Sequence, residues 1–177
     1  MSLKLLARED VKLKLNASEI DNLEHPEFQN FIDDLIRCGE ESDGVGIAAP
    51  QVGQSIRLFI MAPRPNPRYP DAPIMEPTAI INPEILFQSD EKEKGWEGCL
   101  SVPGFRGMVP RSNVISVTYT DRFGKKHAEQ FTGFLARLFL HEFDHLEGVL
   151  FPDRMEKEDS LVTLEEYAAL TGIVVSK

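Results

Sequence analysis

The sequence predicts an α+β fold: a single domain in which antiparallel strands wrap around one central helix. Three observations predict it. A chain of 177 residues suits one domain with a full hydrophobic core. Strand-like runs outnumber helical ones and are separated by turn residues. One apolar helical run, residues 133–140, leads directly into two histidines spaced four positions apart. The domain is expected to span residues 1–177.

The composition excludes several classes of protein. Apolar residues make up 42% of the chain and charged residues 27%, which is ordinary for a globular protein. The formal net charge of −10 has the wrong sign for binding a phosphate backbone, so no specific nucleic-acid partner is expected. No apolar stretch is long enough for a membrane helix, and the N-terminus lacks the apolar core of a signal peptide. We therefore expect a cytoplasmic protein with no membrane partner.

The first elements follow from local patterns. Residues 11–15 alternate apolar and charged side chains, which predicts a short strand or an extended arm. A helix is expected after His25, because Pro26 suits the first helical turn. Gly39 is its expected C-cap, and Cys38 is expected to be a packed structural thiol. The apolar face of this helix comprises Phe28, Phe31, Ile32, Leu35 and Ile36.

Small residues dominate the next segment. Residues 43–53 allow close approach of a ligand or another strand, although a tight turn explains them equally well. Residues 56–61 are expected to form a strand. Half of the twelve prolines then fall between Pro63 and Pro77, which predicts an irregular surface loop near a binding groove.

The middle of the chain is expected to be rich in strands. Residues 78–87 are typical of a strand, a turn and a second strand, and the charged residues 90–94 indicate a solvated loop. Residues 114–120 alternate as a half-buried strand does, and residues 125–131 return as its hairpin partner.

Two helices are expected in the last third of the chain. Thr132 is a suitable cap for the helix that carries the histidines. A last helix is expected near Thr163, because Thr163 and Glu166 have the spacing of a capping box.

The clearest chemical signal is the H-E-x-x-H pattern formed by His141, Glu142 and His145. On a helix, positions i and i+4 share a face, so both imidazoles can reach one metal ion while Glu142 stays beside it to move a proton. The alternative is two histidines on a half-buried helix, each satisfied by ordinary hydrogen bonds.

A hydrolytic metal site needs a third protein ligand and an open position. Cys99 is one candidate, since a thiolate beside two imidazoles suits a borderline divalent metal. Spacing alone does not choose between it and the downstream carboxylates Glu147, Asp153, Glu156 and Glu158.

Three separate segments resemble the signature motifs of the peptide deformylases. They are Gly44–Gln51 (GVGIAAPQ), Glu97–Ser101 (EGCLS) and His141–His145 (HEFDH), in the order found in that family. The chain is therefore identified as similar to this family over most of its length, as one catalytic domain. The resemblance implies that Cys99 is the third metal ligand.

The resemblance also implies a reaction. Cys99, His141 and His145 would hold one Fe²⁺ per chain, which Zn²⁺, Ni²⁺ or Co²⁺ can replace. A metal-bound water would attack the formyl carbon of an N-formylmethionyl nascent peptide and release formate, with Glu142 as general base. The side-chain amide of Gln51 and the backbone N–H of Leu100 would stabilise the oxyanion.

Substrate binding is expected in a groove between the two glycine-rich motifs. Its backbone edges would be Gly44, Val45 and Gly46 on one side and Gly98 on the other, so that the peptide adds as a strand. The pocket for the methionine side chain is expected to draw on Val45, Phe134 and Leu138.

Three positions bear on how closely the chain follows the family. Leu140 precedes the first histidine where many members have Gln. Arg137 falls where an aliphatic residue is frequent, and is expected either to extend toward solvent or to narrow the methionine pocket. Arg106 is expected to form an ion pair with Glu97, in preference to a contact with substrate. His25 and His127 are expected to be exposed or capping residues.

The last segment, residues 154–177, is acidic on balance, so only a transient encounter with the ribosome is expected. Two other functions were weighed. A metallopeptidase that cleaves internal bonds would use a downstream carboxylate ligand and would tolerate Cys99→Ser. A non-catalytic relative that binds peptides would be expected to lack Glu142, Gln51 or a metal ligand, yet all are present.

Overall fold

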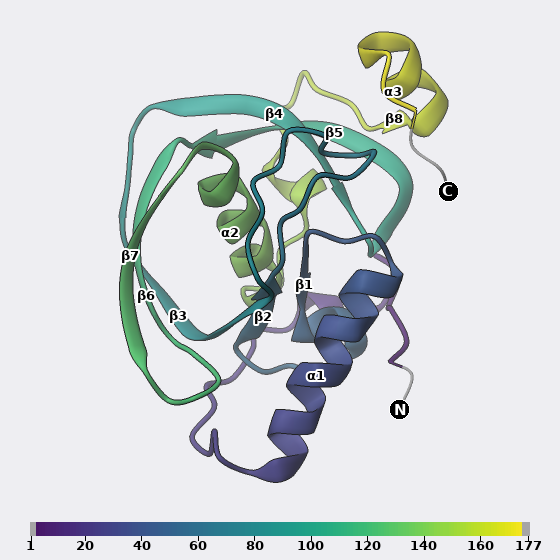
Figure 1. Cartoon of the computed structure of the whole chain (residues 1–177). Coiled ribbons are helices and arrows are strands. Elements are labelled where there is room, and N and C mark those ends of the chain that lie inside the picture. The colour runs from purple at the N-terminus through teal and green to yellow at the C-terminus, as the bar shows by residue number, and fades with distance from the viewer. Residues whose placement is uncertain (1–2, 175–177) are drawn as a thin grey trace.

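The computed structural model describes residues 3–174. Its helices and strands alternate along the chain, with short 3₁₀ helices between them (Figure 1). The α-helices are α1 (Pro26–Glu41), α2 (Gly133–Leu146) and α3 (Leu164–Thr171). The strands are β1 (Gly46–Ala48), β2 (Leu58–Met61), β3 (Thr78–Gln88), β4 (Lys92–Cys99), β5 (Val102–Ser112), β6 (Val114–Thr120), β7 (Lys126–Thr132) and β8 (Val162–Thr163). The 3₁₀ helices are η1 (Val11–Lys14), η2 (Ala49–Val52) and η3 (Phe151–Arg154).

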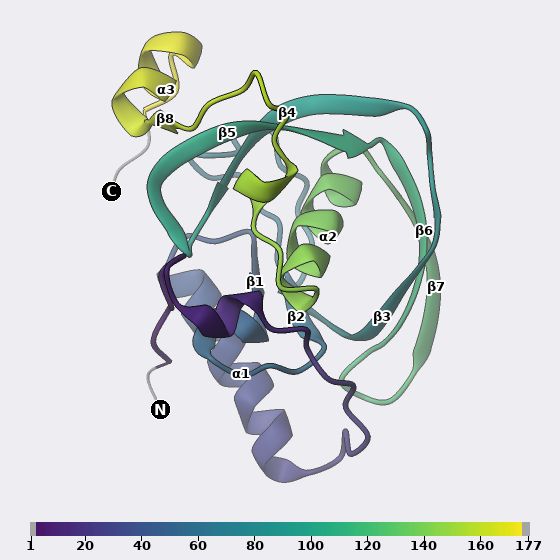
Figure 2. The same cartoon turned by 180° about the vertical axis from the view of Figure 1, so that it is seen from behind.

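The strands form two antiparallel sheets around α2. One sheet has the order β1-β2-β3-β6-β7 and the other the order β4-β5-β8. Both views show α2 enclosed by these sheets, with α1 and α3 on the outside (Figures 1 and 2). The predicted α+β class, with antiparallel strands around a central helix, is confirmed.

Helix α2 is central because it is apolar on most of its circumference. Phe139 is fully buried, and its ring meets Phe59 of β2 edge to face at 5.1 Å between centroids. Burying one such ring contributes about 1.5–3 kcal/mol. Ala136 and Leu146 are also fully buried in the same cluster. This packing fixes the helix that carries the two histidines.

Helix α1 packs its predicted apolar face against the other side of β1 and β2, where Ile32 and Leu35 are fully buried. The prediction that Gly39 caps this helix is wrong, because the helix continues to Glu41 and ends at Ser42. Gly39 is required for packing: a Cβ there would lie 3.0 Å from the Ile47 side chain. Cys38 is buried and unoxidised, as predicted.

Three predictions of local structure are wrong, one of them in part. Residues 11–14 form the 3₁₀ helix η1 with Asp10 as its cap, not a strand. Residues 78–88 form one strand, because the bulge between Ile81 and Glu84 accommodates Pro83 without a turn. The charged run 90–94 is a loop only as far as Glu91, since β4 begins at Lys92, which pairs with Ser112 in the long β4–β5 hairpin.

Other elements match their predictions. The β6–β7 hairpin is present, and Thr163 and Glu166 form the capping box of α3. Thr132 is the N-cap residue of α2, although its side chain makes no capping hydrogen bond. The chain between Pro63 and Pro77 has no helix or strand. In Figure 1 it rises from β2 in front of α2 toward β5 and then returns to β3.

Candidate active site

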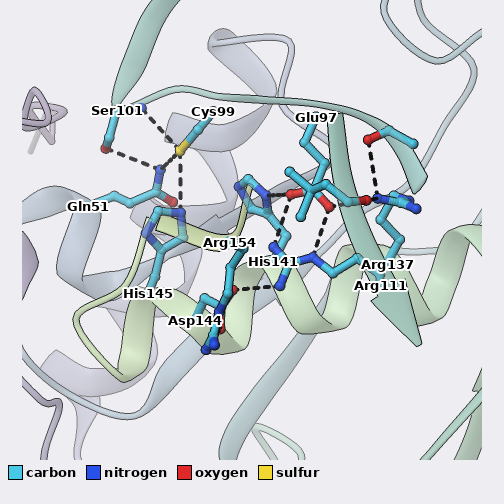
Figure 3. A network of polar contacts seen from close by, with 12 residues as sticks. Gln51, Glu97, Cys99, Ser101, Arg111, Arg137, His141, Asp144, His145 and Arg154 are labelled. Atoms are coloured by element: carbon cyan, nitrogen blue, oxygen red, sulfur yellow. Dashed lines mark hydrogen bonds and ion pairs between the residues drawn. The ribbon is translucent and has the colours of Figure 1, made fainter. Parts of the chain in front are cut away.

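The candidate site lies where three elements meet. The C-terminal end of β4 contributes Cys99, α2 contributes His141, Glu142 and His145, and η2 contributes Gln51. Figure 3 shows the side chains of Gln51, Cys99 and His145 converging. The small residues of the first motif allow this, because a Cβ on Gly46 would lie 2.5 Å from Glu142 Oε1 and 2.9 Å from the Leu138 side chain.

Cys99, His141 and His145 form a group with metal-ligating geometry. One ligand atom of each lies within 4.8 Å of the others, and Cys99 Sγ is 3.4 Å from His145 Nε2. No other such group of His, Cys, Asp or Glu occurs among residues 3–174. A thiolate and two imidazoles suit a borderline or soft divalent cation and leave a fourth position open. The donor set therefore fits a resident metal ion.

Glu97 holds the first histidine in place. The Nδ1–H of His141 donates to Glu97 Oε2 at 2.8 Å, which leaves Nε2 directed toward Cys99. Burial opposes ionisation of Glu97, but its hydrogen bond with His141 and its pairing with Arg111 hold the pKa of Glu97 far below its usual range. A carboxylate behind a ligating imidazole fixes both the tautomer and the ring orientation.

Two arginines neutralise Glu97, and neither is the one predicted. Arg111 donates from Nε and Nη2 to the two carboxylate oxygens at 2.9 and 3.0 Å, and Arg137 donates from Nη1 at 3.0 Å. The predicted Arg106–Glu97 ion pair is absent: Arg106 Nη1 donates to the backbone carbonyl of Phe105 instead. In the hairpin, Glu97 lies opposite Gly107, so Arg111 shares its face and Arg106 points to the other face.

The Glu97 cluster extends along α2. Arg111 also donates to Asp144 Oδ2 at 2.6 Å, and Arg154 reaches Asp144 Oδ1 at 2.7 Å (Figure 3). The sequence predicts that Arg137 either extends toward solvent or narrows the methionine pocket. The structure shows a different arrangement, in which its guanidinium is held by hydrogen bonds. It lines the pocket wall while donating to the carbonyls of Val109 at 2.8 Å and Glu93 at 2.6 Å.

Glu142 is a buried carboxylate with an unused oxygen. It is 3% exposed, and Oε2 has no hydrogen-bond partner among the described residues. Burial raises the pKa of Glu142 to about 7. A carboxylate with this pKa can accept and return a proton near neutral pH, which is the property required of a general base that later acts as an acid.

The other two polar groups of the pocket are oriented by hydrogen bonds. Gln51 Oε1 accepts from the Ala48 backbone N–H at 2.8 Å, so its Nε2 points toward Cys99 Sγ at 3.4 Å and Ser101 Oγ at 3.3 Å. Leu100, which follows Cys99, lines the same pocket. The amide of Gln51 therefore faces the metal-ligand group with its donor side.

The histidines differ in their preference for a proton. Burial disfavours the charged form of each, but hydrogen bonds with Cys99 and Glu97 raise the pKa of His141 well above its ordinary value. Burial and the neighbouring His141 lower the pKa of His145 well below its ordinary value. Neutral His145 is ready to donate a lone pair to a cation.

The pocket continues from these groups into an apolar recess. Val45, Phe134 and Leu138, the residues predicted to receive the methionine side chain, line it together with Gly44, Gly46 and Gly98. The lining residues that were not predicted include Arg68 and Tyr69, which the proline-rich loop contributes. The Tyr69 ring meets Phe134 edge to face at 5.3 Å. The loop was expected to lie near the groove, but no signal in the sequence indicates which of its side chains line the pocket.

The remaining candidates lie outside the site. Glu147 pairs with Arg57 at 2.7 Å and Asp153 with Lys14 at 2.9 Å, and Glu156 contacts Lys94. None of these, nor Glu158, belongs to the metal-ligand group. His25 is the N-cap of α1, accepting from Glu27 N at 3.3 Å, and His127 pairs with Asp121 at 2.7 Å. Lys177, which was counted in the acidic tail, lies outside the described residues.

Known proteins resemble the chain over most of its length. The family model described as polypeptide deformylase matches residues 2–160. Peptide deformylase 2 of Nostoc sp. is 56% identical over 158 residues, which are 89% of this chain and 88% of that protein. A class I type b peptide deformylase from Acinetobacter baumannii, crystallised with Met-Ala-Ser bound, has a TM-score of 0.85 at 45% identity and covers 88% of this chain and 100% of that chain. A peptide deformylase from Synechococcus elongatus in complex with actinonin has a TM-score of 0.78 at 32% identity and covers 98% of this chain and 87% of that chain.

Proposed function

This chain belongs to the polypeptide deformylase family, and we propose that it removes the formyl group from N-formylmethionyl peptides of newly made proteins. The observation that carries the proposal is one pocket that holds a Cys-His-His group, a buried carboxylate with a free oxygen and an inward-facing amide. Water adds to the formyl carbon and the C–N bond breaks, giving formate and a peptide with a free α-amine.

Cys99, His141 and His145 would hold one metal ion per chain. We propose Fe²⁺, which Zn²⁺, Ni²⁺ or Co²⁺ can replace, because a thiolate and two imidazoles bind all four ions. When bound, the cation supplies Lewis acidity, which polarises a carbonyl and makes a water molecule nucleophilic near neutral pH. The thiolate ligand is also prone to oxidation, which suits a reduced cytoplasm.

Glu142 is proposed to move the proton. Its free Oε2 accepts a proton from the attacking water, and the pKa of about 7 lets the same oxygen return that proton to the leaving nitrogen. Gly46 keeps the space beside Oε1 open. Glu142 can therefore protonate the leaving nitrogen itself, and no additional acid is needed in the pocket.

Gln51 and Leu100 are proposed to stabilise the oxyanion. The Nε2 of Gln51 already faces the metal-ligand group, because its Oε1 is held by the Ala48 backbone. Leu100 follows the ligand Cys99, so its backbone N–H can face the same point. One such donor is typically worth about 3 kcal/mol in the transition state.

The peptide is proposed to lie between two strand edges. β1, with Gly44 and Val45 just before its first residue Gly46, is the terminal strand of one sheet, and β4, with Gly98 near its end, is the terminal strand of the other. An extended peptide can hydrogen-bond to such an edge while its methionine side chain enters the recess of Val45, Phe134 and Leu138.

We further propose that residues 1–177 form one catalytic domain that acts in the cytoplasm on nascent chains, with transient proximity to the ribosome. None of the helices that the structure describes is long and apolar enough to cross a membrane. The net charge of −10 disfavours a lasting hold on RNA.

Formate release from formyl-Met-Ala-Ser tests the proposal, with protein prepared without oxygen and its metal counted. Glu142→Gln should keep the metal and lose about 10²- to 10⁴-fold in rate, whereas Glu84→Gln, the same change at an exposed position, should not change it. Cys99→Ser should lose the metal. Metal-loaded protein that releases no formate would contradict the proposal, and activity that survives Cys99→Ser would favour a metallopeptidase with another ligand set.

A further inference from the structure

Two arginines lie beside the reaction centre without a carboxylate partner. Arg106 of β5 and Arg68 of the proline-rich loop line one cavity. Neither forms an ion pair with any carboxylate of residues 3–174, although the chain has 29 acidic residues against 19 basic ones. Because acidic residues outnumber basic ones, a shortage of carboxylates in the chain does not explain why these two arginines have no carboxylate partner.

Arg106 is buried in spite of its unpaired charge. It is 6% exposed, its guanidinium lies against the backbone of Gly98, and its Cζ is 5.9 Å from the centre of the Tyr167 ring. The described residues give it one hydrogen-bond acceptor, the carbonyl of Phe105. Burial lowers the pKa of Arg106, and the like charge of Arg68, which lines the same cavity, also disfavours the charged form of Arg106. Buried charges are normally paired, so the guanidinium of Arg106 is expected to bind an anion that the described residues do not supply.

The cavity adjoins the catalytic pocket. It has a volume of about 300 Å³ and shares Arg68, Cys99 and Leu100 with the pocket that contains Glu142 and Gln51. Pro103, Gly104 and Leu164 complete its wall. A peptide whose formyl end lies at Cys99 can therefore pass Leu100 and place its following residues in this cavity.

We propose that Arg68 and Arg106 form a carboxylate subsite that selects formylmethionyl peptides with Asp or Glu shortly after the methionine. The inference rests on the proposed function. An extended chain advances about 3.3–3.6 Å per residue, so the second or third residue reaches past Leu100. Two guanidinium groups on one carboxylate make charge-assisted hydrogen bonds, which neutral side chains cannot match.

The test compares peptides that differ by one charge. Formate release is measured on formyl-Met-Glu-Ala-amide against formyl-Met-Gln-Ala-amide, and on formyl-Met-Ala-Glu-amide against formyl-Met-Ala-Gln-amide. The Glu peptide of at least one pair should have about tenfold higher kcat/KM, as one charged hydrogen bond implies. The gain should appear in KM, because the contact is remote from the bond that breaks. It should shrink as salt rises.

Variants locate the preference. Arg68→Gln changes a half-buried loop position and should bring the Glu/Gln ratio close to one, whether or not Arg106→Gln folds. Arg68→Glu should invert the preference toward formyl-Met-Ala-Lys-amide. Arg37→Gln removes the same charge from the exposed face of α1 and should leave the ratio unchanged.

The outcomes separate the subsite from the reaction. Formate from neutral peptides with a Glu/Gln ratio near one in the wild type would overturn the subsite and leave the proposed function intact. No formate from any peptide would overturn the function. A preference for formyl-Met-Ala-Ser with a free C-terminus over its amide, without a preference for Glu, would assign the arginines to a terminal carboxylate and overturn the side-chain assignment.

Discussion

Arg106 and Arg111 lie five positions apart on β5, and both are 6% exposed. Arg111 is fully paired, with Glu97 and Asp144 at 2.6–3.0 Å. Arg106 has only a backbone carbonyl among the described residues. The same residue type, on the same strand and at the same burial, therefore meets opposite electrostatic surroundings.

The difference separates structural charge from charge that is available to a ligand. The Glu97 cluster on one face of the hairpin is complete within the chain, and it aligns the metal-ligating His141. On the other face, Arg106 and Arg68 lack a counter-charge at the point where substrate passes. Burial alone would have classed Arg106 and Arg111 together, and only their partners distinguish them.

The largest expected effect in the paired cluster comes from Glu97→Gln. It leaves the guanidinium groups of Arg111 and Arg137 without their shared carboxylate, which should cost about 3–5 kcal/mol in the free energy of unfolding. Because His141 loses its anchor, metal affinity should also fall about 10- to 100-fold. Urea unfolding and metal titration measure the two losses. Glu93→Gln, an exposed position on the same strand, is the control, and an equal effect there would remove the special status of Glu97.

A smaller effect is expected from Arg137→Met. This change removes donors to Glu97 and to the carbonyls of Glu93 and Val109, so the buried acceptors of Glu97 and Val109 lose a partner, at about 1–3 kcal/mol. The retained pairing with Arg111 should keep Glu97 ionised and the metal bound. Unfolding free energy and metal content are compared with those of Arg37→Met on exposed α1. Loss of the metal with an unchanged free energy of unfolding would contradict this prediction, because it would mean that Arg137, and not Arg111, keeps Glu97 in place for the metal site.

The smallest effect is expected at a hydrogen-bonded pair near the surface, Asp121 with His127. Burial disfavours the ionised form of Asp121. Hydrogen bonds from His127 and from the backbone N–H groups of Lys125 and Phe123 outweigh burial, and they lower the pKa of Asp121 below its ordinary value of 3.8. A depressed pKa adds stability above the ordinary value and loses it as the pH falls through the folded pKa. Asp121→Asn should therefore cost about 0.2–1 kcal/mol at pH 7 and less as the solution is acidified toward the folded pKa. The free energy of unfolding in urea, measured across this pH range, checks the prediction, with Asp90→Asn at an exposed position as the control. A cost that does not change with pH would mean that Asp121 acts through the hydrogen bonds of the turn and not through its charge.

The metal-ligand residues could be predicted because their signal is local. His141 and His145 share a helix face by spacing alone, and that face exists because α2 is apolar enough to be buried. The position of Cys99 beside them is different: it depends on how β4 approaches α2, which no spacing gives. Only the resemblance to a family supplied that ligand.

The prediction that Arg106 pairs with Glu97 is wrong because of the alternation of side chains in the β4–β5 hairpin. Arg106 is nearer to Glu97 in sequence, but a hairpin places residues by alternation, and the register Glu97 with Gly107 puts Arg111 on the shared face. That register changes at the irregularity between Glu97 and Cys99, next to the turn, which the sequence pattern does not predict. Arg68 and Tyr69 were missed because an irregular loop has no periodicity from which its direction can be predicted.

The most direct measurement of the central claim is the unfolding free energy of Arg111→Met and Arg106→Met, in urea, with metal content matched to the wild type. Arg111→Met should lose about 3–5 kcal/mol, because two buried carboxylates lose a partner. Arg106→Met should stay within about 1 kcal/mol of the wild type or be more stable, because it removes an unpaired buried charge and loses only one hydrogen bond to the Phe105 carbonyl and a cation–π contact. Equal large losses in the two variants would contradict the account, since they would mean that Arg106 has a structural role that its contacts do not reveal.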